Sequence, residues 1–315
     1  MCKIRNEEGE IEQRNVVQQS GVFYDLLPKG GEIDLDTVEV FADNTVLRDS
    51  LYDIETINNY QDSGRTLLII KIKRSTDALT KIEGAGGFVT SKVTSMASML
   101  YNCYNLKELY ISTWDTSKVT SMESMFYNCN NLKELDVSTW DTSSVTNMAY
   151  MFYNCNKLTE LEPIKGWNTS NVTAMSSMFY YCTSLKNIDL SPWNTSAVLN
   201  MDSMFANCTS LESLDISGWS TLWLQQCQSM FYFCNKLITI FVSDCWDLTN
   251  ATSHYSMFYY CNNIIGQNNT TYNNSYTDKT RAVIDTDETP GYLSYKSART
   301  GQAGNYAEKH GFPHW

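Results

Sequence analysis

The chain has 315 residues, enough for more than one folding unit with a core of its own. Its formal net charge of −12 at pH 7 excludes nucleic acid and anionic membrane as main partners, because both require clustered Lys and Arg. No apolar run approaches the roughly 18–20 residues that span a membrane, so no transmembrane segment is predicted.

Residues 1–75 show no repeat and are predicted to form an N-terminal arm and a β cap. Residues 1–8 are charged where a secretory signal would place its hydrophobic stretch, so no signal peptide is predicted. Cys2 has two interpretations: an ordinary second residue, which we favour, or the lipidated cysteine of a trimmed lipoprotein. Strands are predicted at 32–36, 38–41 and 67–72, the last of them leading into the repeats and shielding their open end.

Residues 76–265 are dominated by a repeat of 26 or 27 residues. Cysteines and tryptophans return at this interval, and a fixed period of this size indicates stacked structural units. The cysteines are Cys103, Cys129, Cys155, Cys182, Cys208, Cys234 and Cys261, and the tryptophans are Trp114, Trp140, Trp167, Trp193, Trp219 and Trp246.

One unit shows how each coil is expected to fold. Apolar residues with seven-residue returns predict a helix with one buried face, and they are Val119, Met122, Met125, Phe126, Cys129 and Leu132. The step then shortens to two at Leu135 and Val137, which is the alternation of a strand. Residues 140–143 supply a turn and a helix N-cap. The predicted fold class is therefore an α/β repeat with seven strand-turn-helix coils and capping β elements at both ends.

The string Trp-Asp-Thr-Ser-x-Val-Thr-x-Met-x-x-Met-Phe-x-x-Cys-x-x-Leu occurs at 114–132 and again at 140–158. It resembles the 26-residue repeat of BspA-like bacterial surface proteins, which has relatives in Listeria-type surface lipoproteins and mycoplasma proteins. The resemblance covers about residues 93–264. It implies a leucine-rich-repeat-like solenoid with a role in surface attachment or recognition, and it implies no catalytic residue.

Methionine and cysteine columns are the first candidates for chemistry. Every methionine except Met1 falls in two columns, which indicates either a soft-metal or promiscuous binding surface or, as we favour, core filling by a flexible side chain. The seven column cysteines are expected to be free buried thiols, since an odd number cannot all pair. Neither a C-x-x-C pair nor a Ser-His-Asp or Cys-His arrangement is found, so we predict no metal, no cofactor and no enzymatic activity.

The outward positions of the predicted strands form the candidate binding face. In a solenoid these strands make one parallel sheet, and their outward side chains line a continuous acidic stripe with an aromatic at each end. The stripe is interpreted either as a recognition surface for a basic or hydroxyl-rich partner or as an ordinary solvated face. Its residues are Glu108, Tyr110, Glu134, Asp136, Glu160, Glu162, Asp189, Asp215 and Phe241.

Residues 266–315 are predicted to form a polar connector, a terminal hairpin over 282–295 and a tail. Together these features predict a non-catalytic recognition or adhesion module on the outer face of a bacterium or bacteriophage, with a host protein or a glycan as its ligand. The main alternative is a structural virion component, a capsid decoration or a tail or fibre protein, docked through the non-repeat ends, and a third hypothesis is an intracellular scaffold. In the first two cases partners are virion or surface proteins reached through the N-terminal arm, and nucleic acid is not among them.

Overall fold

The computed structural model describes residues 93–109 and 111–297, and before them the backbone of strands β1–β9. These strands form three separate antiparallel groups and one parallel pair with the next part of the chain. They are β1 (Cys2–Arg5) with β2 (Ile11–Arg14), the sheet β3 (Val17–Gln19), β4 (Val22–Leu26), β8 (Leu67–Ile72) and β7 (Tyr52–Ile57), and β5 (Phe41–Ala42) with β6 (Thr45–Val46).

The predicted strand at 67–72 is present as β8, but it pairs antiparallel with β4 and β7 and not with the repeats. The strand that joins the first coil is β9 (Lys81–Ile82), which pairs parallel with β10 (Glu108–Leu109). Of the other predicted strands, 32–36 and 38–40 lie outside the described residues.

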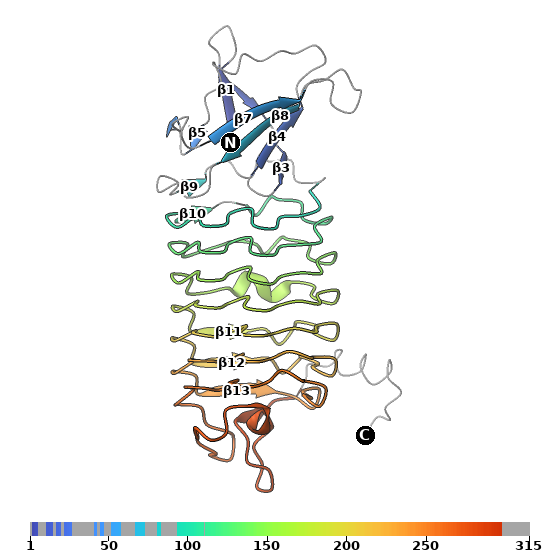
Figure 1. Ribbon diagram of the computed structural model, residues 1–315, viewed down its shortest axis with the longest axis vertical. Helices are drawn as coiled ribbons and strands as arrows, with labels where there is room; N and C mark the ends of the chain where they lie inside the picture. Colours follow the sequence, from blue (N-terminus) through green and yellow to red (C-terminus); the bar gives the residue numbers. More distant parts are fainter. Residues whose placement is uncertain are drawn as a thin grey trace.

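The repeats form successive coils that stack on one another along the long axis of the molecule (Figure 1). We number the coils one to seven from Val93, Val119, Val145, Val172, Val198, Leu224 and Ala251. A ladder of single parallel bridges crosses all seven, at Ser95, Ser121, Asn147, Ala174, Asn200, Gln226 and Ser253. Each coil therefore bonds through its backbone to the coils on either side.

A second ladder is formed by strands in only part of the stack. The parallel sheet contains β11 (Asn187–Asp189), β12 (Ser213–Asp215), β13 (Thr239–Val242) and β14 (Leu293–Tyr295). The segments 134–137 and 160–162, which the period predicts as strands, have no strand pairing, and a 3₁₀ helix, η5 (Glu162–Gly166), begins in coil three. Pro163 in its first turn favours that helix, since its ring presets a helical φ and removes a strand donor.

The segments predicted to be helical are hydrogen-bonded turns in the structure. In coil one the N–H groups of Met96, Ser98 and Leu100 donate to carbonyls of coil two at 2.8–2.9 Å, whereas those of Met99, Tyr101 and Cys103 bond back three positions within the coil. Ser98 and Asn102 have φ of 55° and 64°, in the left-handed region, and the same two positions repeat it in every coil. A left-handed residue every four positions prevents the i→i−4 bonds of an α-helix.

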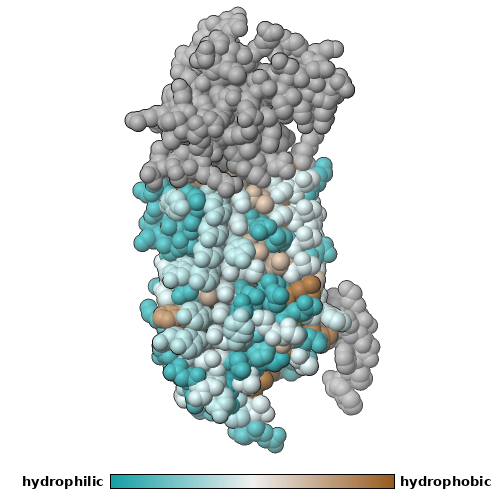
Figure 2. Space-filling model, viewed as in Figure 1, coloured by the Kyte–Doolittle hydropathy of each residue, from teal (hydrophilic) through white to brown (hydrophobic). Residues whose placement is uncertain are grey.

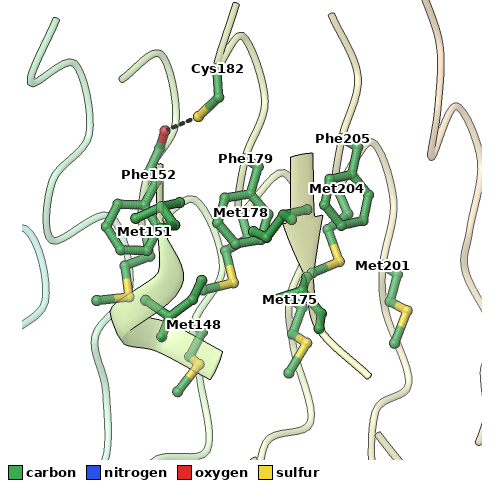
Figure 3. Packing of buried hydrophobic residues seen from close by; sticks show 14 of the residues in the cluster. Met148, Met151, Phe152, Met175, Met178, Phe179, Cys182, Met201, Met204 and Phe205 are labelled. Carbon is green, nitrogen blue, oxygen red and sulfur yellow. Dashed lines mark hydrogen bonds between the residues drawn. The ribbon is translucent and has the colours of Figure 1, made fainter. Parts of the chain in front are cut away.

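The inside of the stack is packed by the repeated columns themselves. The column methionines, phenylalanines, leucines and tryptophans are almost all fully buried, and Figure 3 shows methionine and phenylalanine rows continuing from coil to coil. Phe126 and Phe152 stack at 5.4 Å between ring centroids, and Trp140 and Trp167 at 6.2 Å. The buried indole N–H groups of Trp140, Trp167, Trp193 and Trp219 each donate to a carbonyl one coil away, as in the 2.9 Å bond from Trp193 to the Ile164 carbonyl.

The sheet ends at a cap formed by residues 265–297. The chain leaves the repeat within coil seven, passes through the 3₁₀ helix η6 (Lys279–Arg281), and returns as β14 beside β13 of coil six, where the strand of coil seven would otherwise lie. The predicted terminal hairpin is not formed, because β14 pairs parallel with β13 and the bridge from Ile284 to Leu293 is also parallel. The cap covers an edge that would otherwise expose unpaired backbone.

Candidate binding faces

The strand face, the row of outward residues predicted above, lies along one side of the stack. Asp189, Asp215 and Phe241 occupy paired positions on β11, β12 and β13, and all three are half-buried. Four acidic residues nearer the N-terminus are exposed, namely Glu134, Asp136, Glu160 and Glu162. Tyr110 and the side chain of Glu108 lie outside the described residues.

Lysines neutralise the C-terminal half of this face. Lys165 Nζ lies 3.2 Å from Glu162 Oε1 and 2.7 Å from Asp189 Oδ2. Lys296 pairs with the Asp215 carboxylate and sits 5.5 Å from the centroid of the Phe241 ring. Among the described residues of the predicted acidic stripe, carboxylates without a lysine partner therefore remain only in coils two and three, at Glu134, Asp136 and Glu160.

The electrostatics of Asp189 follow from these contacts. Burial alone would raise the pKa of this carboxyl, but hydrogen bonds from Lys165 and then from Ser191 outweigh it and lower the pKa to about 2. Asp189 is therefore ionised over the whole physiological range and holds Lys165 between two coils.

The aspartates of the strand face also build the turn that follows each strand segment. Asp136 Oδ1 accepts the Ser138 N–H at 3.2 Å and its hydroxyl at 2.7 Å, and Asp189 binds Ser191 in the same way at 3.0 and 2.6 Å. An Asp that binds the backbone two residues on is a standard turn former. These side chains are thus partly structural.

A second surface, which the sequence analysis missed, carries a row of tyrosines. Their rings stack from coil to coil with centroid distances of 4.6, 4.3 and 4.7 Å and interplanar angles of 12°, 2° and 5°. The row resumes at 5.6 Å in the last two coils after one interruption at Ala206. Its members are Tyr101, Tyr127, Tyr153, Tyr180, Tyr232 and Tyr259. The same 26- or 27-residue period that revealed the cysteines would have revealed them.

The two left-handed columns flank this row. One is serine in every coil except coil three, where it is Tyr150; the other is Asn102, Asn128, Asn154, Tyr181, Asn207, Phe233 and Tyr260. Contacts join all three columns, since Tyr150 lies 6.1 Å from Tyr153 and Tyr180 5.1 Å from Tyr181, centroid to centroid. We call these 21 positions, three columns over seven coils, the tyrosine ribbon.

The cysteine column is inside the stack and does not form a reactive site. Cys182 Sγ donates to the Phe152 carbonyl at 3.2 Å (Figure 3), and the same bond joins Cys129, Cys155, Cys208, Cys234 and Cys261 to the coil before them. Burial raises the pKa of the Cys182 thiol to about 12. These thiols are held protonated, which disfavours both nucleophilic and metal-binding chemistry. The methionine columns are buried with them, as core filling predicts.

Other chemistry finds little support in the part of the chain that the structure describes. There, no group of three or more His, Cys, Asp or Glu side chains is arranged to hold a metal ion. No helix among these residues is long and apolar enough to cross a membrane. The outer surface in Figure 2 is mostly hydrophilic, with small separate hydrophobic areas.

The geometry defines a class of protein, one in which near-identical coils stack through backbone ladders and buried columns. The chain belongs to the family described as "Mycoplasma protein of unknown function, DUF285", whose model matches residues 71–161 and 159–272, well over half of the sequence. No curated protein and no solved structure matches the chain.

Proposed function

We propose that this protein is a non-catalytic recognition module, a leucine-rich-repeat-like solenoid that displays a binding face on the outside of a bacterium or a bacteriophage. The resemblance of its repeat to that of BspA-like surface proteins supports this reading. The ligand is a host protein or a glycan with basic or hydroxyl-rich groups.

The observation that carries the proposal is that some columns of the repeat are buried and others are exposed. The conspicuous repeat residues are buried and serve stacking, so what distinguishes one coil from the next lies on exposed positions. On the strand face, Glu134, Asp136 and Glu160 are exposed, and within the described residues no Lys or Arg pairs with them. Uncompensated charge of one sign favours a partner of the opposite sign.

The test is charge reversal of this acidic area. The triple variant Glu134→Lys, Asp136→Lys, Glu160→Lys and the unchanged chain are applied to a glycan array and to a panel of purified basic host-surface proteins. A control variant with the same change in net charge carries Glu123→Lys, Asp115→Lys and Asp141→Lys away from the strand face. We expect binding to fall at least about tenfold, or roughly 1.4 kcal/mol, in the first variant only. Equal binding by all three chains would remove the strand face from consideration.

A further inference from the structure

The tyrosine ribbon is uncharged in a chain that is otherwise strongly acidic. Residues 93–264 carry 7 basic and 14 acidic side chains, and none of them falls on its 21 positions. The ribbon consists of nine tyrosines, six serines, four asparagines, one phenylalanine and one alanine. Tyrosine, serine and asparagine are the residues that binding surfaces use for rigid contact area and adaptable hydrogen bonds.

Several ribbon side chains occur where the backbone disfavours them. Tyr150, Tyr181, Phe233 and Tyr260 have φ between 59° and 62°, a conformation that asparagine tolerates and that bulky residues rarely adopt. Tyr150, Tyr181 and Tyr260 are also 37–43% exposed, so core packing does not account for them. Backbone strain combined with exposure indicates that these rings are present for contact with something outside the coil.

The ring geometry narrows the kind of partner. Because neighbouring tyrosines stack face to face, most ring faces are covered by the next ring, and the ribbon presents ring edges and hydroxyls. A sugar stacks on exposed ring faces, and the ribbon has few of these. Ring edges and hydroxyls suit another protein surface that carries aromatic rings, hydroxyls and amides, and no clustered charge.

We propose that the occupant is a second copy of this chain, paired ribbon to ribbon and antiparallel about a two-fold axis at coil four. At a net charge of −12, two copies repel each other across most of their surfaces. The ribbon brings them together without facing like charges. All of its 21 positions except the buried Ser177, Ala206 and Asn207 are available for contact, which approaches the roughly 20 residues a side at the low end of a stable interface. Since the ribbon repeats with each coil, a small favourable free energy of association per coil adds up along its length.

In this arrangement bulky and small side chains of the ribbon meet at four pairs of facing positions. The axis sets coil three against coil five, coil two against coil six and coil one against coil seven, with each column facing itself. Coil three carries two rings, Tyr150 and Tyr153, where coil five has the small Ser203 and Ala206.

The asparagine column follows the same rule. Phe233 of coil six faces Asn128 of coil two, and Tyr260 of coil seven faces Asn102 of coil one. A parallel pairing about a two-fold axis along the stack would exchange the two flanking columns and set each member of the tyrosine row against its own copy, which leaves a gap where Ala206 faces Ala206. Only the antiparallel pairing sets Tyr153 against Ala206. Coil four meets its own copy at the axis, so Tyr180 and Tyr181 each face themselves, and the rest of the tyrosine row faces tyrosines.

The pairing is tested by sedimentation velocity of the full chain over a range of concentrations, with a concentration-dependent dimer expected. Tyr181→Glu sets two carboxylates against each other at the axis and is expected to weaken self-association about tenfold or more. The matched variant Tyr255→Glu, on an exposed side chain outside the ribbon, is expected to dimerise like the unchanged chain. A monomer at every concentration, or equal loss in both variants, would overturn the proposal.

The register is tested separately by cysteine substitution and a short bis-maleimide cross-linker, because facing backbones about 10 Å apart are too distant for a disulfide. Tyr181→Cys is expected to give cross-linked dimer beyond the background of the unchanged chain. Tyr260→Cys, in the same column and similarly exposed, is not expected to give cross-linked dimer, since it faces Asn102. The double variant Asn102→Cys, Tyr260→Cys is expected to restore cross-linking. Cross-linking by Tyr260→Cys alone, or none by Tyr181→Cys, would contradict this register. Neither result depends on ligand binding by the strand face.

Discussion

Lys165 of coil three lies 2.7 Å from the carboxylate of Asp189 in coil four, and this ion pair joins two coils across the strand face. Both side chains are about 70% buried, so the pair is more shielded from solvent than a typical surface contact. Asp189, which the sequence suggests is available for binding, is therefore part of the scaffold.

Replacing Lys165 by Met is expected to raise the pKa of Asp189 from about 2 towards the ordinary value of about 3.9. A depressed folded-state pKa means that ionised Asp189 stabilises the fold above about pH 4, and that this stabilisation is lost as the pH falls towards 2. The melting temperatures of the variant and the unchanged chain should therefore differ most above pH 4 and converge near pH 2. Lys133→Met, at an exposed lysine of coil two, controls for the lost charge. A gap of the same size at pH 5 and pH 2 would contradict the assignment.

Asp285 is expected to be the residue on which the C-terminal cap depends most. Its buried carboxylate accepts the N–H groups of Asn268, Thr270 and Gly291 at 2.8–3.1 Å and the Thr270 hydroxyl at 2.6 Å. Asp285→Ala leaves these donors unpaired, at a cost of roughly 1–3 kcal/mol for each one that stays buried. Hydrogen exchange should show the amides of Asn268, Thr270 and Gly291 losing protection.

The exposed Asp287, which holds only the Asn268 side chain at 3.0 Å, provides the matched control as Asp287→Ala. Burial acts to raise the pKa of Asp285, but the hydrogen bonds from Thr270, Gly291 and Asn268 prevail and lower it. The cap is therefore expected to hold above about pH 4 and to loosen as the pH falls below that. Unchanged protection in Asp285→Ala would show that the cap is held by other contacts.

Thiol trapping should distinguish the first cysteine of the column from the rest. Cys103 is half-buried, and a hydrogen bond with Cys129 lowers the pKa of its thiol despite the opposing effect of burial. Cys155 and Cys208 are fully buried, and burial raises their pKa values well above the usual range. With a maleimide at pH 7.5, peptide mass spectrometry should find Cys103 modified well before Cys155 and Cys208. Modification of all three at one rate would mean that the stack opens as a whole.

How much of the fold can be predicted from the sequence depends on whether the contact follows the repeat period. The 26- or 27-residue period predicts which side chains are buried, because residues such as Cys155 and Phe152 recur with the coil and meet their equivalents. The helix was predicted from apolar spacing alone. That spacing also fits a run of turns in which Ser98 and Asn102 are left-handed, and the recurring asparagine is the only one of the two residue types that tolerates this conformation.

The candidate site was predicted less completely for a physical reason. Whether Asp189 is available for binding depends on Lys165, 24 positions earlier, and no periodicity links the two, since the other coils lack a lysine at that place. The same holds for Lys296, which reaches Asp215 only because the chain returns as β14. The tyrosine row, in contrast, follows the repeat period and was available to sequence reasoning throughout.

Asn128 is expected to stabilise the stack in two separable ways. Its backbone has φ of 61°, and its side chain links coils by donating to Asn102 Oδ1 and accepting from Asn154 Nδ2, both at 2.8 Å. Asn128→Gly keeps the left-handed backbone accessible and loses the side-chain bonds, worth about 0.5–1.5 kcal/mol each. Asn128→Ala loses the same bonds and adds a left-handed strain of roughly 1–2 kcal/mol. Chemical denaturation should therefore rank the unchanged chain above Asn128→Gly and Asn128→Ala last. If the alanine variant proved as stable as the glycine variant, the left-handed turns that replace the helix in this coil would be in error.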